Sequence, residues 1–353
     1  MKPFVELSFM PTCLASQKNQ IFPYGGNNSM PKSDKVWEKL ITKFIEHILE
    51  RYGKDEVESW YFEVWNEPNL PLDFISTHHY STDDPLWKSG MDIEEFFRRS
   101  KGKPSDYYRG VLKEMTTKTR KEAKEYPLFY TEWNVSAMLG DAIHDEPYAA
   151  AMVAKTLADN YGLVDCYSYW TFSDIFEEQS QKPGIFHGGF GLQTVEGIEK
   201  PVFRLFEFFH NLGNQRIKVE DNNNSTAEIL AVQKGKDLQI VAYNHNVPSG
   251  KIKTEQLTID LDHKFNGNYE IKRIDENHAN PKKLWQEMGE PTYVDKEQLA
   301  KLRSASQLVS EQLAIKSGKI NLELLPQSCA LITILNYFLQ DYISVVNKYL
   351  NIT

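Results

Sequence analysis

The stretch WYFEVWNEPN, residues 60–69, joins an aromatic, strand-like run to a carboxylate at its end. Trp, Tyr, Phe and Val dominate the run, and these residue types favour a buried β-strand. Glu67 stands at the tip and is followed at once by Pro68. Because the residue before a proline is pushed towards extended backbone, Glu67 is expected to stay on the strand and not to enter a helix.

Strand-like and helix-like segments alternate over residues 1–213, which indicates parallel βαβ units. The strands are predicted at 3–9, 60–66, 73–80, 127–133 and 165–171. The helices are predicted at 34–52, 105–125, 146–161 and 200–212. The strand at 127–133, LFYTEW with Pro127 before it, also carries a carboxylate near its end, Glu132.

Two carboxylates at strand ends suggest glycosidase chemistry. In α/β barrels the reactive groups stand at the carboxyl ends of the strands, where the loops form the cleft. One carboxyl group can protonate the leaving oxygen while the other attacks the anomeric carbon, and a retaining enzyme holds the pair about 5–5.5 Å apart. Either motif alone is also found in ordinary turns, so it is the pair of Glu67 and Glu132 that favours catalysis.

The segment STHHY, residues 76–80, adds polar groups to the same region. Successive strand residues point to opposite faces, so His78 and Tyr80 share one face and His79 lies on the other. His78 and Tyr80 can therefore orient a carboxylate or a sugar hydroxyl, or they can simply pack.

Three further candidates lie in the strand at 165–171 or in the loop after it. Trp170 would offer an aromatic platform for a sugar ring, or it belongs to the core. Glu177 and Glu178 lie in the loop beyond and can accept hydrogen bonds from sugar hydroxyls, or they are a solvated pair.

Composition excludes several other classes. The chain has 353 residues, 41% hydrophobic and 25% charged, which is typical of a soluble globular protein and long enough for two domains or for one large barrel with an appendage. A net charge of −9 argues against a nucleic-acid partner, and no apolar run is long enough for a membrane. Three scattered cysteines predict no disulfide framework or zinc knuckle, and no secretory signal is visible, which favours the cytoplasm. HGGFGL at 187–192 lacks the spacing of a phosphate loop.

The sequence changes character near residue 214. From there to residue 334, apolar and polar residues alternate between turn signals, which predicts a C-terminal antiparallel β-sandwich interrupted by one charged helix at 296–313. Residues 335–353 can be drawn as an amphipathic helix or as a tail without settled structure.

The motifs KPFVELSFMP, WYFEVWNEPNL, DFISTHHY, LFYTEWN and YSYWTFSDIFEE together resemble glycoside hydrolase family 39, in its β-xylosidase branch. The strands after residue 214 resemble the accessory β-sandwich of that family. The resemblance implies an α/β fold of the (β/α)8 TIM-barrel type that hydrolyses β-xylosides or xylo-oligosaccharides with retention. It implies that the reaction needs neither a metal nor a cofactor. The expected partner is a small saccharide substrate, and a homo-oligomer is compatible with the resemblance.

The resemblance also assigns roles to individual residues. Glu67 resembles the acid/base, Glu132 the nucleophile, and Asn66 the residue that binds the sugar 2-hydroxyl. The remaining matches resemble the lining of the sugar subsite: His78, Tyr80, Trp170, Glu177 and Glu178.

This chain departs from the family in its number of strands. Residues 1–213 supply five barrel-type strands, whereas a closed barrel needs eight. In the family two βα units precede residue 3, and a helix, a strand and a helix separate the WNEP and STHHY motifs. Here Pro68–Leu72 are too few for a parallel crossover. They predict a tight antiparallel return that carries His78 and Tyr80 to the end opposite Glu67.

Two alternatives therefore stay open beside the enzyme. The chain can be an inactive remnant or a sugar-binding protein without activity, because strands are missing. It can also resemble an α-L-iduronidase, but the motifs around Glu67 and Glu132 offer no Lys or Arg to hold a substrate carboxylate.

Overall fold

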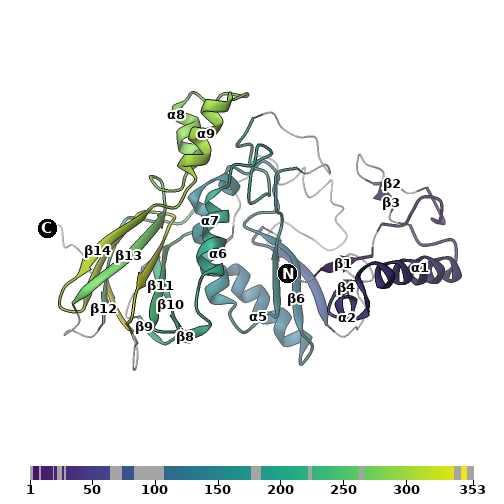
Figure 1. Cartoon of the computed structure of the whole chain (residues 1–353), viewed down its shortest axis with the longest axis horizontal. Helices are drawn as coiled ribbons and strands as arrows, with labels where there is room; N and C mark the ends of the chain where they lie inside the picture. The colour runs from purple at the N-terminus through teal and green to yellow at the C-terminus, as the bar shows by residue number, and fades with distance from the viewer. Residues whose placement is uncertain are drawn as a thin grey trace.

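The computed structural model shows a mixed α/β protein with three regions arranged in a row (Figure 1). A small N-terminal lobe lies at one end, a group of parallel strands with helices lies in the middle, and a β-rich region lies at the other end. The structure describes residues 3–7, 9–18, 20–21, 26–27, 29–63, 74–82, 107–175, 184–221, 225–261, 266–337 and 343–347.

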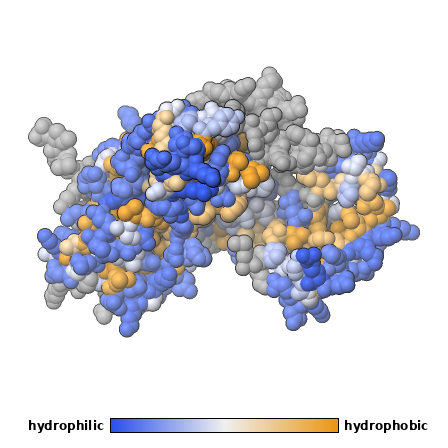
Figure 2. Space-filling view, turned by 45° about the horizontal axis from the view of Figure 1, so that its top comes forward, coloured by the Kyte–Doolittle hydropathy of each residue, from blue (hydrophilic) through white to orange (hydrophobic). Residues whose placement is uncertain are grey.

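The N-terminal lobe is built around helix α1, Asp34–Tyr52, whose bounds agree with the prediction. It ends at Gly53, which has a φ of 83° that favours glycine. The other elements of the lobe are β1 Phe4–Glu6, β2 Gln20–Ile21, β3 Gly26–Asn27, α2 Lys54–Val57 and β4 Tyr61–Glu63. β1 pairs in parallel with β4. Hydrophobic residues gather on the surface of this lobe (Figure 2), and its exposed side chains include Met30 and Leu49.

The central sheet has three parallel strands in the order β5, β6, β7. They are β5 Ile75–Tyr80, β6 Leu128–Asn134 and β7 Cys166–Tyr169. The accompanying helices are α5 Val111–Ala123, the 3-10 turn η1 Ala142–Asp145, α6 Pro147–Asp159 and α7 Pro201–His210. The predicted alternation of strands and helices is therefore confirmed for these described units, with shorter elements than expected.

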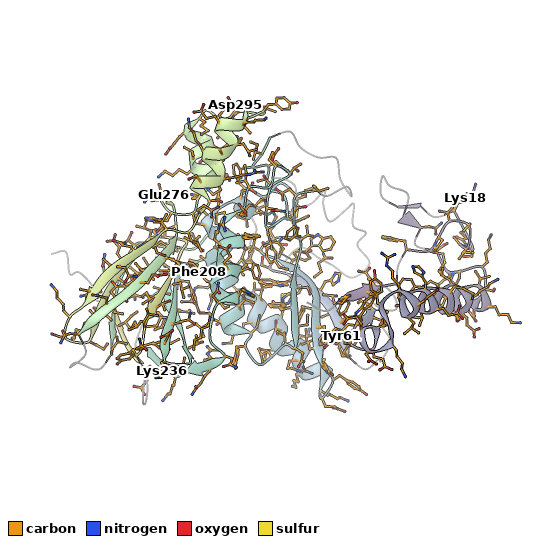
Figure 3. The ribbon with its side chains drawn as sticks, viewed as in Figure 1. Lys18, Tyr61, Phe208, Lys236, Glu276 and Asp295 are labelled. Atoms are coloured by element: carbon orange, nitrogen blue, oxygen red, sulfur yellow. The ribbon has the colours of Figure 1, made fainter. Side chains whose placement is uncertain are left out.

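Strands β4 and β5 run in the same direction, which overturns the predicted antiparallel return. The ring of Tyr61, at the start of β4, lies 6.2 Å from that of Phe74, which precedes β5 (Figure 3 labels Tyr61). Two residues further along each strand, Ser76 donates a 2.6 Å hydrogen bond to Glu63. Phe129, near the start of β6, stacks on Phe74 at 4.8 Å. The starts of these strands therefore meet at one ring cluster, and their carboxyl ends lie on the same side.

The β-rich region consists of a six-stranded sheet, ordered β14-β13-β16-β11-β10-β8, and a four-stranded sheet, ordered β15-β12-β17-β9. The strands are β8 Gln215–Ile217, β9 Val219–Asp221, β10 Ala227–Lys234, β11 Asp237–Asn244, β12 Glu255–Asp260, β13 Gly267–Ile274, β14 Ser310–Ile315, β15 Lys319–Leu324, β16 Ser328–Ile334 and β17 Ile343–Asn347. Neighbouring strands are antiparallel except for β17 and β9. Buried side chains of both sheets, such as Ile240 and Leu322, form one common core.

One prediction for this region is wrong in detail: the helix expected at 296–313 is α9, Lys296–Ala305, and Ser310–Ile315 of that segment forms β14. A second helix, α8 Pro281–Glu287, was not predicted. Within residues 335–353, for which an amphipathic helix and a tail without settled structure both stayed open, residues 343–347 form strand β17. Asp295 starts α9 with a capping box, in which it accepts a 2.8 Å hydrogen bond from the Gln298 amide.

Helices α6 and α7 fill the space between the central strands and the six-stranded sheet. α6 is buried on almost every side, and its alanines allow both neighbours to approach closely. Phe208 of α7 is fully buried in the same core (Figure 3). Strands β11 and β16 are consequently buried on both faces, whereas β15, whose outer face is open, shows the alternating burial predicted for a sandwich strand.

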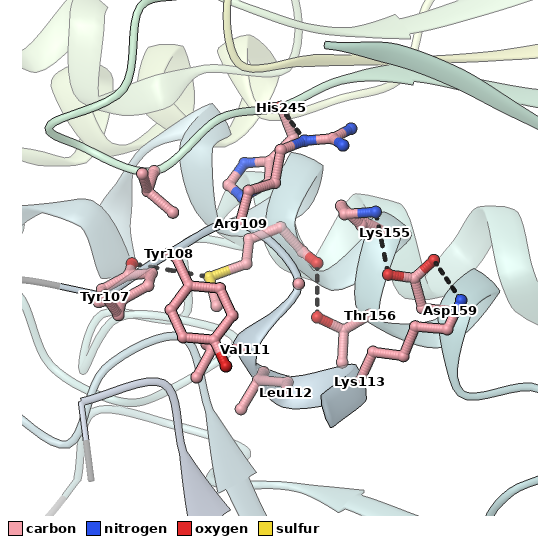
Figure 4. A pocket seen from close by; sticks show the side chains of 13 residues that line it. Tyr107, Tyr108, Arg109, Val111, Leu112, Lys113, Lys155, Thr156, Asp159 and His245 are labelled. Atoms are coloured by element: carbon pink, nitrogen blue, oxygen red, sulfur yellow. Dashed lines mark hydrogen bonds and ion pairs between the residues drawn. The ribbon is translucent and has the colours of Figure 1, made fainter. Parts of the chain in front are cut away.

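An ion-pair network also joins the central region to the β-rich region. Glu228 of β10 lies 2.5 Å from Arg109 and 3.2 Å from Lys155 of α6, and it accepts a hydrogen bond from Tyr243. Arg109 donates a 2.9 Å hydrogen bond to the carbonyl of His245, at a small pocket shown in Figure 4. Burial acts to raise the pKa of Glu228, but the charges of Lys155 and Arg109 outweigh it and lower the pKa.

Within the part of the chain that the structure describes, none of the helices is both long enough and apolar enough to pass through a bilayer.

We expect the Glu228→Gln variant to lose about 1–3 kcal/mol of unfolding free energy at pH 7, since a charged hydrogen-bond acceptor is removed between two regions. The folded pKa of Glu228 lies below its unfolded value of about 4.3, so its contribution is present above that pH and is lost as pH falls through the folded pKa. Urea unfolding at pH 7 and below pH 4 should therefore show a difference between wild type and variant that shrinks in acid. Glu220→Gln, which removes the partner of the exposed Lys218 in a pair more exposed than that of Glu228, is the matched control, and an equal loss in that variant would contradict the expectation.

Candidate active site

Strand β6 carries one residue more than its neighbour β5. Thr77 pairs with Tyr130 and the next residue, His78, pairs with Glu132, so Thr131 has no counterpart on β5. Such β-bulges redirect a side chain and are frequent beside active sites. The bulge falls directly before Glu132.

The bulge turns Glu132 away from the helices. Tyr130 and Trp133 both contact the ring of Tyr167, at 5.3 and 4.2 Å between ring centres, and both are buried. Residues three apart share a face of a strand only when an extra residue intervenes. Glu132, between them, therefore points to the opposite face, where its side chain is 21% exposed.

The structure brings Glu132 together with two of the predicted residues. Tyr80 donates a hydrogen bond to Oε1 of Glu132, and Nδ1 of His78 lies 3.5 Å from Oε2. Each carboxylate oxygen thus has one partner from β5. This side-by-side placement follows from the parallel register of β5 and β6.

His79 points to the other face, as the alternation predicted. It is buried, stacks on Tyr130 at 3.9 Å and hydrogen-bonds to the hydroxyl of Tyr167. Burial, with His78 beside it, lowers the pKa of His79 to about 3, so this imidazole is neutral near pH 7. His79 therefore packs on the face of the sheet opposite Glu132, and its neutral imidazole adds no positive charge near that carboxylate.

Trp170 follows β7 directly, at the carboxyl ends of the strands. Its amide donates a 2.9 Å hydrogen bond to the carbonyl of Trp133, and its side chain is partly buried. The remaining predicted site residues lie outside the described part of the chain: Asn66, Glu67, Glu177 and Glu178.

A buried ion triad that the sequence did not reveal lies beneath the loops after β6 and β7. Nζ of Lys200 is 2.6 Å from Oδ1 of Asp145 and 2.8 Å from Oδ2 of Asp174, and all three side chains are inaccessible to solvent. Burial alone would lower the pKa of Lys200, but the two carboxylates outweigh it and raise the pKa. Burial likewise raises the pKa of Asp174, against the opposing charge of Lys200.

The motif HGGFGL supplies backbone donors to this triad. The amide of Gly188 donates to Asp145 at 2.6 Å, and the amide of Gly191 donates to Asp174 at 2.8 Å. A Cβ on Gly189 would come within 2.4 Å of the Asp174 carboxylate, so only glycine fits. The glycines of HGGFGL, which do not have the spacing of a phosphate loop, are thus the signal in the sequence that could have pointed to the ion triad.

The hairpin α8–α9 of the β-rich region contacts the same loops. It lies above α7 in Figure 1. Trp285 contacts Phe186 at 5.6 Å between ring centres. Lys282 donates a 3.1 Å hydrogen bond to the carbonyl of Ala142, and Arg303 donates a 2.7 Å hydrogen bond to that of Glu196. The β-rich region therefore helps to hold the frame of the site.

Among the described residues, no group of three or more His, Cys, Asp or Glu side chains is placed to hold a metal ion. Strand β5 places a phenol and an imidazole beside Glu132.

A carboxylate at the carboxyl end of a parallel strand, bonded by a tyrosine and approached by a histidine of the neighbouring strand, is compatible with one half of the carboxylate pair of a glycoside hydrolase. The chain belongs to the glycosyl hydrolases family 39, whose family model matches residues 1–71 and 69–320.

Similar proteins agree with this family. The chain is 38% identical over 399 residues to a β-xylosidase of Caldicellulosiruptor saccharolyticus, covering 95% of this chain and 80% of that one. Its fold matches a GH39 enzyme from Xanthomonas axonopodis pv. citri with a TM-score of 0.76 and 25% identity, over 95% and 79% of the two chains. It also matches a monomeric β-xylosidase from Caulobacter crescentus with a TM-score of 0.74 and 24% identity, over 95% and 81%.

The comparisons also place a deletion within the chain. The two matched segments of the family model meet at residues 69–71, between β4 and β5. The alignment with the Caldicellulosiruptor enzyme spans 399 residues, more than the 353 of this chain, so the relative has internal residues that this chain lacks.

We expect Lys200→Met to lower the free energy of unfolding by about 3–5 kcal/mol, because it leaves two buried carboxylates without their counter-charge. The change is measured by urea or thermal unfolding at pH 7. Lys301→Met, on the exposed face of α9, removes a lysine that pairs with the exposed Glu297 and should leave the midpoint unchanged. Equal behaviour of the two variants would show that the triad does not hold the loops.

Proposed function

We propose that this protein is a retaining β-xylosidase that cleaves β-xylosides and short xylo-oligosaccharides by double displacement, with Glu132 as the nucleophile. The observation that carries the proposal is the Glu132 carboxylate, turned out of β6 by the bulge and bonded by Tyr80. The name β-xylosidase borne by its relative from Caldicellulosiruptor supports the choice of sugar.

The surroundings of Glu132 suit a nucleophile. A nucleophilic carboxylate must be ionised and held in one orientation so that one oxygen can reach the anomeric carbon. A hydrogen bond donated by Tyr80 favours the ionised form and fixes the plane of the carboxylate. His78 stands beside the second oxygen, and in this role it would contact either Glu132 or a sugar hydroxyl.

Glu67 is proposed as the acid/base that protonates the leaving oxygen and later activates water. It lies outside the described residues, so its support comes from the WNEP motif and from the direction of β4. β4 runs the same way as β5 and β6, and its carboxyl end lies on the side where Glu132 stands. Asn66 is proposed to bind the sugar 2-hydroxyl, and the subsite lining would include Trp170, Glu177 and Glu178.

The architecture proposed for this function is a TIM-type barrel with an accessory β-sandwich. The parallel pairing of β1 with β4 and of β5, β6 and β7 supports the first part, and the two sheets around a common core support the second. No cofactor is required by a mechanism that uses two carboxylates.

A second candidate, an inactive remnant or sugar-binding protein, is favoured by one specific observation. In the described residues β1 and β4 form their own two-stranded sheet, and β4 touches β5 through side chains without joining its sheet. A barrel of this type closes with eight strands, and catalysis needs carboxylates placed to within about 0.5 Å.

Hydrolysis of an aryl β-xyloside tests the proposal. Wild-type protein should release the aglycone, and NMR of the first product should show the β-anomer. Glu132→Gln should lower kcat by at least about 10⁴-fold, because no covalent intermediate can form. An aryl α-iduronide serves as the competing substrate. A well-folded wild type without turnover on either substrate would instead identify the inactive remnant.

The role of Glu67 has its own test. Glu67→Gln should retain more activity on a xyloside with a good leaving group than on one with a poor leaving group, because only the poor one needs a proton. Added azide should restore turnover by replacing the activated water and should give a β-xylosyl azide. Equal losses on both substrates, with no azide product, would assign the acid/base to another residue.

A further inference from the structure

Asn134 lies two residues after Glu132, at the end of β6, and is completely buried. Its side-chain amide nitrogen donates to two backbone carbonyls, those of Trp170 and Phe190, the second at 3.2 Å. A carboxamide has two N–H donors, and both are used here.

The side-chain amide oxygen of Asn134 also accepts two hydrogen bonds. It accepts a 2.6 Å hydrogen bond from the amide of Val135 and a 2.8 Å hydrogen bond from the hydroxyl of Tyr169. A buried polar side chain with every position satisfied is rigid, because any rotation would leave a donor or acceptor without a partner.

These bonds join three segments that are distant in the sequence. They are the end of β6 with Glu132, the start of the loop after β7 with Trp170, and the glycine-rich segment with Phe190. Backbone bonds complete the junction, since the Thr171 amide donates to the Phe190 carbonyl at 3.0 Å and the Leu192 amide donates to that of Thr171 at 2.9 Å.

We propose that Asn134 is a positioning residue for the glycosidase reaction, which fixes the backbone at Trp170 relative to Glu132 and so sets where the sugar sits against its nucleophile. The proposal rests on the proposed function of Glu132. Asparagine is required because only a neutral amide can donate to two carbonyls and accept two bonds in this shape. An aspartate would face two carbonyls with a negative charge, and a leucine would bond to none.

A second buried asparagine offers a matched control. Asn244 of β11 is as buried as Asn134 and donates to the carbonyls of Lys253 and Leu324, at 2.8 and 3.2 Å. It accepts a 2.6 Å hydrogen bond from Thr226. It lies in the β-rich region, in a different sheet from Glu132, and none of its described hydrogen bonds reaches β5, β6 or β7.

The kinetic test compares Asn134→Asp, Asn134→Leu and Asn244→Asp on an aryl β-xyloside between pH 4 and 8. We expect kcat/KM to fall about 100-fold in both Asn134 variants, the cost typical of a small misplacement of reacting groups. Asn134→Asp should recover part of kcat in acid, where a protonated carboxyl can again donate one bond, while Asn134→Leu should not. Asn244→Asp should lose stability with kcat, KM and the pH profile unchanged.

A second readout does not depend on activity. Hydrogen exchange at the Thr171 and Leu192 amides should accelerate at least about tenfold in Asn134→Asp and stay at the wild-type rate in Asn244→Asp. Kinetics and exchange that are alike in the two variants would overturn the positioning role. Inactivity of the wild type would remove the proposed function, while the exchange rates would still decide whether Asn134 fixes the backbone at Trp170.

Discussion

The buried triad of Lys200, Asp145 and Asp174 is the constraint on which the loops beside Glu132 depend. Removing three charges from water costs several kcal/mol for each ion, and the cost is offset only when each charge meets its partners at close range. Here one ammonium lies between two carboxylates, and amides of the glycine-rich segment supply further bonds to both. The triad therefore joins the loop after β6, the loop after β7 and the start of α7 in one fixed geometry.

This constraint explains why a β-rich region matters to a site on parallel strands. The loops above the triad have little regular structure of their own, so their outer side needs a cover that excludes water. The hairpin α8–α9 provides it with Trp285, and Lys282 and Arg303 bind carbonyls of the same loops. On the inner side, α6 and α7 are packed against the six-stranded sheet and tied to it through Glu228. The central strands are thus supported from two directions.

The sequence predicted what local patterns determine. The predicted helix at 34–52 has the bounds of α1, and the alternation in STHHY placed His78 and Tyr80 opposite His79. It could not reveal the bulge at Thr131, because a bulge depends on the pairing of two strands and not on one strand alone. The predicted direction of β5 was wrong for a related reason. The number of residues between two strands restricts their relative direction only if the strands are neighbours in one sheet. In the described residues β4 and β5 belong to different sheets. The ion triad could not be predicted directly, because Asp145, Asp174 and Lys200 are far apart in the sequence.

The described half of the site and the strand that precedes Glu67 are stabilised very differently. Glu132, Tyr80 and Asn134 stand on strands held by a continuous core of helices and sheets. β4 is attached to these strands by the hydrogen bond between Glu63 and Ser76 and by a ring cluster in which Tyr61 is still 46% exposed. Side-chain contacts of this kind transmit position less rigidly than a ladder of backbone hydrogen bonds, and local opening follows where few buried contacts must break. Glu132, the proposed nucleophile, is therefore placed by the fold as a whole, whereas its distance from the proposed acid/base, Glu67, would depend on how firmly β4 is docked on β5.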